Sequence, residues 1–129
     1  MKFLLSVVLL TAISLSLSAQ KSACSKFKNG KFKNTYNGHT AVIVRSDAYQ
    51  TEYIINQKDS LKMVFNVKWV DDCSYTLTPT QQTLAQYTKI PKNALITVKM
   101  SNVTDSSYTE TSTSNFVAKT IVSEMIRVR

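Results

Sequence analysis

The sequence contains little glycine, proline, histidine and cysteine, and each shortage excludes a class of protein. Two Gly and two Pro among 129 residues exclude glycine-rich cofactor loops and collagen-like repeats. The single histidine, His39, leaves little material for a His-built metal site or a His-based catalytic triad. No Ser or Cys lies in a nucleophile-elbow pattern. We therefore expect a non-enzymatic protein without cofactor or metal.

The N-terminus has the features of a targeting sequence. Lys2 precedes an apolar run over residues 3–17, and Ala19 offers the small residue that signal peptidase requires. The run is too short for a comfortable membrane span. The pattern predicts a signal peptide over residues 1–19 and one domain over residues 20–129, exported to the periplasm, cell envelope or medium.

The domain that follows is basic, with 15 basic and 8 acidic side chains and a net charge of +7. Its two cysteines are Cys24 and Cys73. In an oxidising compartment they are expected to form a disulfide, whose loop of about 50 residues would contribute roughly 3–4 kcal/mol. Two free thiols are the alternative. A lipid anchor on Cys24 is a further alternative, although Lys21 fits a lipobox poorly.

Alternation of apolar and polar residues dominates the rest of the chain. The clearest case is residues 61–70, where apolar side chains occupy every second position. Residues 81–93 break the pattern and predict a connection with one or two helical turns. Residues 116–128 fit a strand or a helix, and their β-branched residues favour the strand. The other alternating segments are residues 30–36, 40–46, 49–55, 73–78, 94–101 and 108–112.

Short turns join these segments, and no long helix alternates with them. This organisation predicts an all-β fold, a single antiparallel meander of about eight strands. Such a meander either closes into a barrel or folds into a two-sheet sandwich. The sequence leaves both architectures open.

Part of the sequence resembles a group of short exported bacterial proteins without established function. The resemblance lies in Cys-x-x-Phe-x-x-Gly-x-Phe from Cys24, then Arg45, Gln50 and Glu52, then Trp-x-x-Asp-Cys-x-Tyr-x-Leu from Trp69. Some members carry an automatic label as DNA topoisomerase IV, which an exported chain without a nucleotide site does not support. The Gly-x-Phe opening also resembles the Gly-x-Trp of lipocalin-type barrels, which implies a similar architecture.

Arg45, Gln50 and Glu52 form the most distinctive polar set. If residues 47–48 make a two-residue turn, Arg45 lies opposite Gln50, and Glu52 shares their face of the hairpin. The set could bind the polar head of a ligand. It could instead be an exposed cross-strand pair that fixes register, worth about 0–1 kcal/mol.

Four large side chains at alternate positions offer a second candidate site. Met63, Phe65, Trp69 and Tyr75 could line a ligand cavity or simply fill the core. Asp71 and Asp72 provide too few carboxylate ligands for a calcium site.

The lysines after the signal peptide offer a third feature. They form either a patch for an anionic surface or a solvated strand that resists aggregation; they are Lys21, Lys26, Lys28, Lys31 and Lys33. The sequence therefore predicts a monomeric protein that binds a small, partly apolar ligand, inside a barrel if the meander closes, and no nucleic acid. The alternative is a structural or adaptor protein of the cell envelope.

Overall fold

The computed structural model describes residues 23–36, 38–55 and 60–129 of the chain. The predicted signal peptide, residues 1–19, lies outside the described residues. The elements are β1 (Gly30–Tyr36), β2 (His39–Arg45), β3 (Tyr49–Ile55), β4 (Ser60–Asp71), β5 (Ser74–Pro79), α2 (Gln81–Gln86), β6 (Ile96–Ser101), β7 (Ser107–Ser114) and β8 (Ile121–Arg127).

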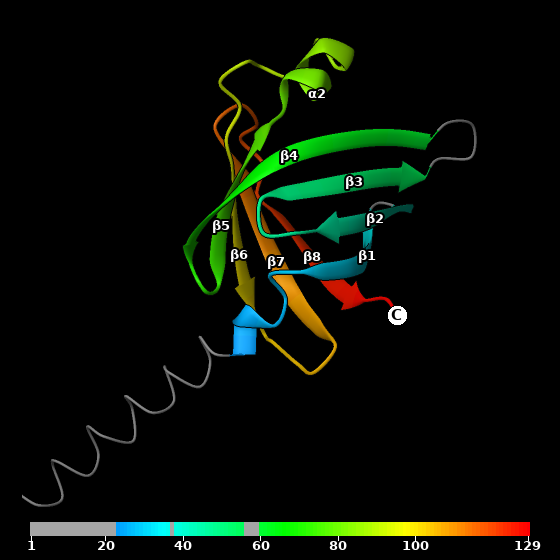
Figure 1. Ribbon diagram of the computed structural model, residues 1–129, viewed down its shortest axis with the longest axis vertical. Coiled ribbons are helices and arrows are strands. Elements are labelled where there is room, and N and C mark those ends of the chain that lie inside the picture. Colours follow the sequence, from blue (N-terminus) through cyan, green and yellow to red (C-terminus); the bar gives the residue numbers. More distant parts are fainter. Residues whose placement is uncertain (1–22, 37, 56–59) are drawn as a thin grey trace, which may run out of the picture.

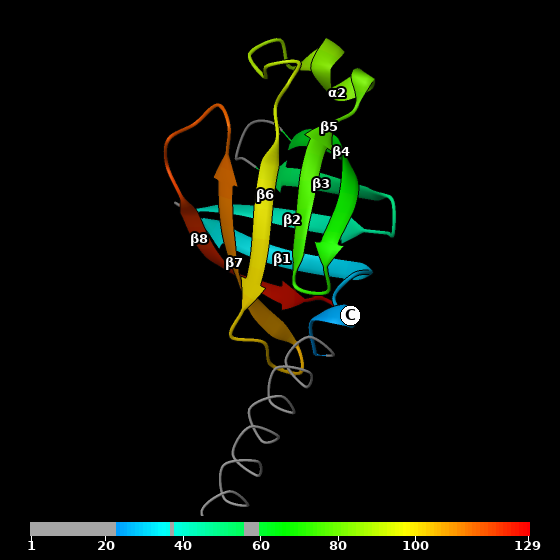
Figure 2. The same ribbon diagram turned by 90° about the vertical axis from the view of Figure 1, so that its left-hand side faces the viewer.

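The eight strands form a closed antiparallel barrel. Each strand pairs with the next along the chain, and β1 pairs with β8 through Phe32 and Arg127. In Figure 2, β1 to β3 run across the direction of β5 to β7, and the twelve-residue strand β4 curves from one group towards the other. The all-β meander is therefore confirmed, and of the two predicted architectures the chain adopts the barrel.

Alternation along the strands decides which side chains face the interior. On β4, Phe65 lies opposite Gln50 and Trp69 lies opposite Tyr75. Both partners point inward, as the predicted alternation requires. The buried apolar residues form one cluster: Cys24, Phe27, Phe32, Ile43, Phe65, Tyr75, Leu77, Val98, Met100, Tyr108 and Met125.

A short segment before β1 fills one end of the barrel. The amides of Phe27 and Lys28 donate to the carbonyls of Cys24 and Ser25, which makes a helical turn. The ring of Phe27 is fully buried, 5.0 Å from the ring of Tyr108 between centroids. Figure 1 shows this turn and the C-terminus at the same end of the barrel, opposite α2.

The disulfide between Cys24 and Cys73 is confirmed. It ties the helical turn to the β4–β5 hairpin, with 5.2 Å between the two Cα atoms. It also uses the Cys24 sulfur that a lipid anchor would need.

Gly30 lets the chain enter β1 at this crowded end. Its φ of 140° disfavours other residues, and a Cβ there would lie 2.8 Å from an Nη of Arg127. Arg127 itself stacks over the rings of Phe27 and Phe32 and donates a hydrogen bond to the carbonyl of Lys26. Glycine at this position therefore allows the helical turn and the last strand to pack together.

The predicted bounds of the strands hold to within two residues, except at the final strand. The final strand begins at Ile121, so residues 116–120 belong to a connection. Within residues 81–93 the chain forms α2, whose N-cap Thr80 accepts a hydrogen bond from the Thr83 amide. The Thr83 hydroxyl donates to the Val64 carbonyl at 2.9 Å, which anchors the helix on β4.

Candidate functional site

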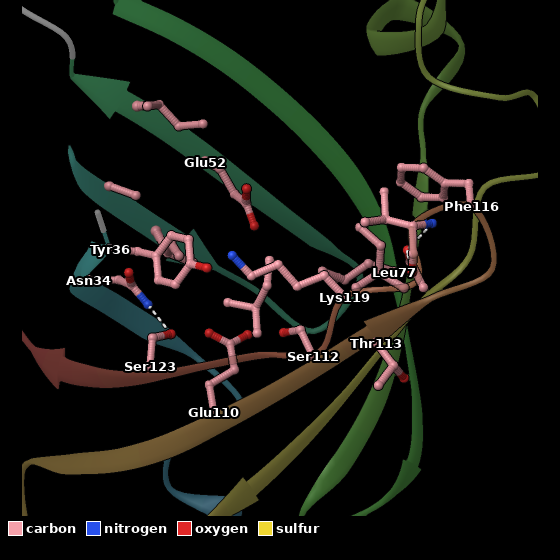
Figure 3. A pocket seen from close by; sticks show the side chains of 17 residues that line it. Asn34, Tyr36, Glu52, Leu77, Glu110, Ser112, Thr113, Phe116, Lys119 and Ser123 are labelled. Atoms are coloured by element: carbon pink, nitrogen blue, oxygen red, sulfur yellow. Dashed lines mark hydrogen bonds between the residues drawn. The ribbon is translucent and has the colours of Figure 1, made fainter. Parts of the chain in front are cut away.

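A cavity of about 400 Å³ lies inside the barrel, away from the disulfide-linked segment (Figure 3). Seven of the eight strands contribute to its wall, β4 being the exception. Phe116, Val117 and Lys119, on the exposed connection between β7 and β8, border it. The lining residues are Asn34, Tyr36, Ala41, Ile43, Glu52, Ile54, Leu77, Ile96, Glu110, Ser112, Thr113, Ser114, Phe116, Val117, Lys119, Ile121 and Ser123.

The cavity exists because the inward side chains change size along the strands. On β7 the inward positions run from Tyr108 through Glu110 to Ser112. On β2 they run from Arg45 through Ile43 to Ala41. On these two strands the inward side chains become smaller towards the cavity, while larger ones such as Tyr36 on β1 and Ile54 on β3 form part of its wall.

Arg45 organises the polar interior between the filled end and the cavity. Its side chain is 2% exposed, and each guanidinium nitrogen donates a hydrogen bond. Nε donates to Gln50 Oε1 at 2.8 Å, and Nη1 donates to the Phe27 carbonyl at 2.8 Å. Nη2 donates to the hydroxyls of Tyr75 at 2.7 Å and Tyr108 at 2.9 Å. The guanidinium also lies over the rings of Phe32 and Tyr75, so every nitrogen of the buried charge has a partner.

Two carboxyl groups extend this network into the cavity. Gln50 Nε2 donates to Glu52 Oε1 at 3.0 Å, and the Tyr75 hydroxyl lies 3.5 Å from Glu110 Oε1. Figure 3 shows Glu52 and Glu110 reaching into the same space from facing walls, β3 and β7. Each carboxyl group is therefore connected to Arg45 through one intervening side chain, Gln50 for Glu52 and Tyr75 for Glu110.

Burial dominates the ionisation of these carboxyl groups. It raises the pKa of Glu110 to about 7, with the negative charge of Glu52 adding to the effect and Arg45 opposing it. Burial also raises the pKa of Glu52, while Gln50 and Arg45 act in the opposite direction. Near neutral pH the proton occupancy of Glu110 is consequently sensitive to any charge that enters the cavity.

The bordering residues carry the remaining polar groups. The Nζ of Lys119 lies 5.4 Å from the ring centroid of Tyr36, and in the view of Figure 3 its side chain extends between Glu52 and Glu110. On the wall, Asn34 Nδ2 donates to the Ser123 hydroxyl at 2.7 Å. Among the lining residues that the structure describes, Lys119 is the one cationic side chain.

The predicted polar set comes together, but not as an exposed pair. Arg45 lies opposite Gln50 as expected, yet both side chains are buried inside the barrel, 2% and 0% exposed. The idea of a surface pair is thus wrong, because the inward face of the β2–β3 hairpin is the face that carries these residues. Glu52 lines the cavity. Gln50 donates a hydrogen bond to Glu52, and Arg45 in turn donates one to Gln50.

The apolar candidates lie elsewhere in the barrel. Phe65 is buried in the core, and Met63 and Trp69 pack against that core without lining the cavity. Tyr75 belongs to the Arg45 network. The Nε1 of Trp69 is buried without a hydrogen-bond partner, and its ring lies 5.1 Å below the ammonium of Lys28.

Sequence reasoning missed Glu110, Ser112 and Lys119. The strand that carries Glu110 has polar residues on both faces, so alternation gives no sign of which face is inward. The one available signal is Tyr108, which shares the inward face with Glu110 and is 1% exposed.

The basic surface is partly neutralised. Lys28 pairs with Asp72 at 2.9 Å, and Lys26 lies 3.8 Å from Asp105. Asp71 accepts a hydrogen bond from the Cys73 amide within the β4–β5 turn, while Asp72 ties that turn to Lys28. Lys31 and Lys33 are exposed on β1, while Lys21 lies outside the described residues.

No protein-family model matches the chain, and no curated protein or solved structure shows significant similarity to it. Within residues 23–36, 38–55 and 60–129, no helix is long and apolar enough to cross a membrane. The same residues contain no group of three or more His, Cys, Asp or Glu side chains arranged to hold a metal ion.

Proposed function

We propose that this protein is a non-enzymatic binding protein, exported through its N-terminal signal, that holds a small, partly apolar ligand inside the barrel. The observation that carries the proposal is the cavity of about 400 Å³. Ligand pockets are typically concave, roughly 300–1,000 Å³ in volume, and mainly apolar with a few convergent polar groups.

The composition of the wall supports this proposal. Aliphatic side chains, among them Ile54, Leu77 and Ile96, provide contact area for an apolar body. The carboxyl groups of Glu52 and Glu110 converge from opposite walls. A ligand would gain apolar contacts from the first set and orientation from the second.

The disulfide and the Arg45 network support a rigid site. They hold the filled end of the barrel together, and Gln50 and Tyr75 link that end to the two carboxyl groups. A pre-organised wall reduces the ordering cost of binding.

The test uses N-phenyl-1-naphthylamine, an uncharged dye whose emission rises in apolar surroundings. The wild-type protein should bind it saturably with one molecule per chain. Ser112→Phe places a ring in the cavity and should weaken binding by about ten-fold or more, since it removes most of the accessible space. Native mass spectrometry of protein from its own host should show a co-purifying small molecule.

The matched control is Thr111→Phe, the neighbouring residue on β7, whose side chain points to the outer surface because successive residues alternate. It should bind the dye like the wild type. Absence of saturable binding, or equal loss in both variants, would count against a ligand in the cavity.

A further inference from the structure

We propose that the ligand is an amphiphilic amine, with its ammonium group between Glu52 and Glu110 and its apolar body against the aliphatic wall. The inference rests on the proposed function and names the ligand class for that cavity.

The first argument is the supply of hydrogen-bond acceptors. An ionised carboxylate offers several acceptor positions and no donor. Glu52 accepts from Gln50, and Glu110 lies within reach of the Tyr75 hydroxyl, which leaves further lone pairs on both groups. An ammonium carries three donors, so it can contact both carboxylates at once.

The second argument is the orientation of Arg45. Its three guanidinium nitrogens donate to Gln50, to the Phe27 carbonyl and to two tyrosine hydroxyls. The charge is therefore enclosed by its own partners, behind Tyr75 and Gln50. Apart from Lys119, the charged groups among the described residues that line the cavity are the two carboxyl groups, which would repel an anionic ligand head.

The third argument concerns Lys119, the cationic residue of the lining. It sits on the exposed connection and reaches over Tyr36 from β1. Its own ammonium thus points into the space that the two carboxyl groups face, as a built-in competitor for an amine. Removal of this charge should favour an amine and disfavour a carboxylate.

The charges around Glu110 set the expected pH dependence. Glu52 on β3, Arg45 on β2 and Tyr75 on β5 act on its ionisation. Tyr108 interacts with it from the same strand. Tyr36 on β1 and Lys119 on the connection line the same cavity. The lining residues of β6 and β8 are uncharged: Ile96, Ile121 and Ser123. An ammonium requires ionised carboxylates, so its affinity should rise as Glu110 loses its proton.

The experiment compares three probes that share an indole body: tryptamine, tryptophol and indole-3-acetate. Each displaces N-phenyl-1-naphthylamine from the wild-type protein at about pH 6 and about pH 8, where tryptamine stays protonated. At the higher pH tryptamine should bind about ten-fold more tightly than tryptophol, with indole-3-acetate weakest. At the lower pH the advantage of tryptamine over tryptophol should shrink several-fold.

Variants separate the roles of the charges. Glu110→Gln should remove most of the pH dependence and, like Glu52→Gln, reduce the preference for tryptamine by about ten-fold. Glu124→Gln, the same substitution on the exposed face of β8, is the control and should leave the preference unchanged. Lys119→Met should strengthen tryptamine binding and weaken indole-3-acetate binding.

Two outcomes would overturn the amine assignment while leaving the proposed function intact. One is equal binding of all three probes. The other is a preference for indole-3-acetate that Lys119→Met abolishes, which would make the cavity an anion site. Absence of any dye binding would instead overturn the proposed function itself.

Discussion

The two ends of the barrel belong to one closed sheet but differ in what the sheet encloses. At one end the helical turn with Cys24 and Phe27 packs against Phe32 and Tyr108, and the interior is full. At the other end the inward side chains are mostly aliphatic or polar, and a cavity of about 400 Å³ remains. The sheet is continuous between them.

This difference shows that alternation alone does not determine whether a barrel has a core or a binding site. Alternation selects the residues that face inward; their sizes, and a segment from outside the sheet, decide whether the interior is filled. Arg45 lies where the two regions meet, because it bonds to the Phe27 carbonyl on one side and to Gln50 and Tyr75 on the other.

The same substitution at the two ends should have very different effects. Phe27→Ala removes a fully buried ring while keeping the backbone carbonyl that Arg45 uses, and should lower the free energy of unfolding by about 3–5 kcal/mol. Phe116→Ala, at a cavity-lining residue that is 41% exposed, should cost about 1 kcal/mol or less. Urea unfolding measures both, and equal losses would contradict the distinction between a filled and an open end.

Removal of the disulfide should weaken the filled end while leaving the cavity in place. The double variant Cys24→Ser, Cys73→Ser is expected to lose roughly 3–4 kcal/mol of unfolding free energy, since the unfolded chain regains the freedom of a long loop. The folded fraction should still bind N-phenyl-1-naphthylamine with nearly the wild-type affinity. Complete loss of dye binding in protein shown to be folded by circular dichroism would mean that the two ends depend on each other.

The pH dependence of the free energy of unfolding tests the cavity end of the barrel through the carboxyl group of Glu110. The pKa of Glu110 rises to about 7 in the folded protein, above its value of about 4.3 when unfolded. Folding therefore favours the protonated carboxyl: its contribution is fully present below about pH 4 and is lost as the pH rises through about 7. The loss should be on the order of 3–4 kcal/mol.

Glu110→Gln isolates that contribution, because the amide cannot ionise. The difference in unfolding free energy between the variant and the wild type should grow with pH over this interval. A difference that stays constant from acid to neutral pH would show that Glu110 keeps an ordinary pKa and that the cavity is well solvated.

Much of the barrel was predictable because strands and short turns are encoded by neighbouring residues in the sequence. The alternation over residues 61–70 matches β4 (Ser60–Asp71) to within one residue at each end. The short turn after Arg45 correctly places that residue opposite Gln50. The alternation of apolar residues is sufficient to locate the strand, and the length of the turn is sufficient to set the register of the hairpin, because both follow from strand geometry.

The site was harder to predict because it depends on closure. Whether Arg45 faces water or the interior is decided by the curvature of the whole sheet, which no local pattern encodes. The strand that carries Glu110 has polar residues on both faces, so its inward face can be identified only once the barrel has closed. The cavity likewise follows from the sizes of residues that lie far apart in the sequence.

The pairing of β1 with β8 has a consequence for assembly. In an open sheet the outermost strands offer unsatisfied amides and carbonyls, to which a foreign peptide or a neighbouring copy can add as a further strand. Here the ring supplies each strand with a partner on both sides. Strand addition is therefore blocked along the stretches that are paired on both sides, and growth into fibrils through them would first require the ring to open.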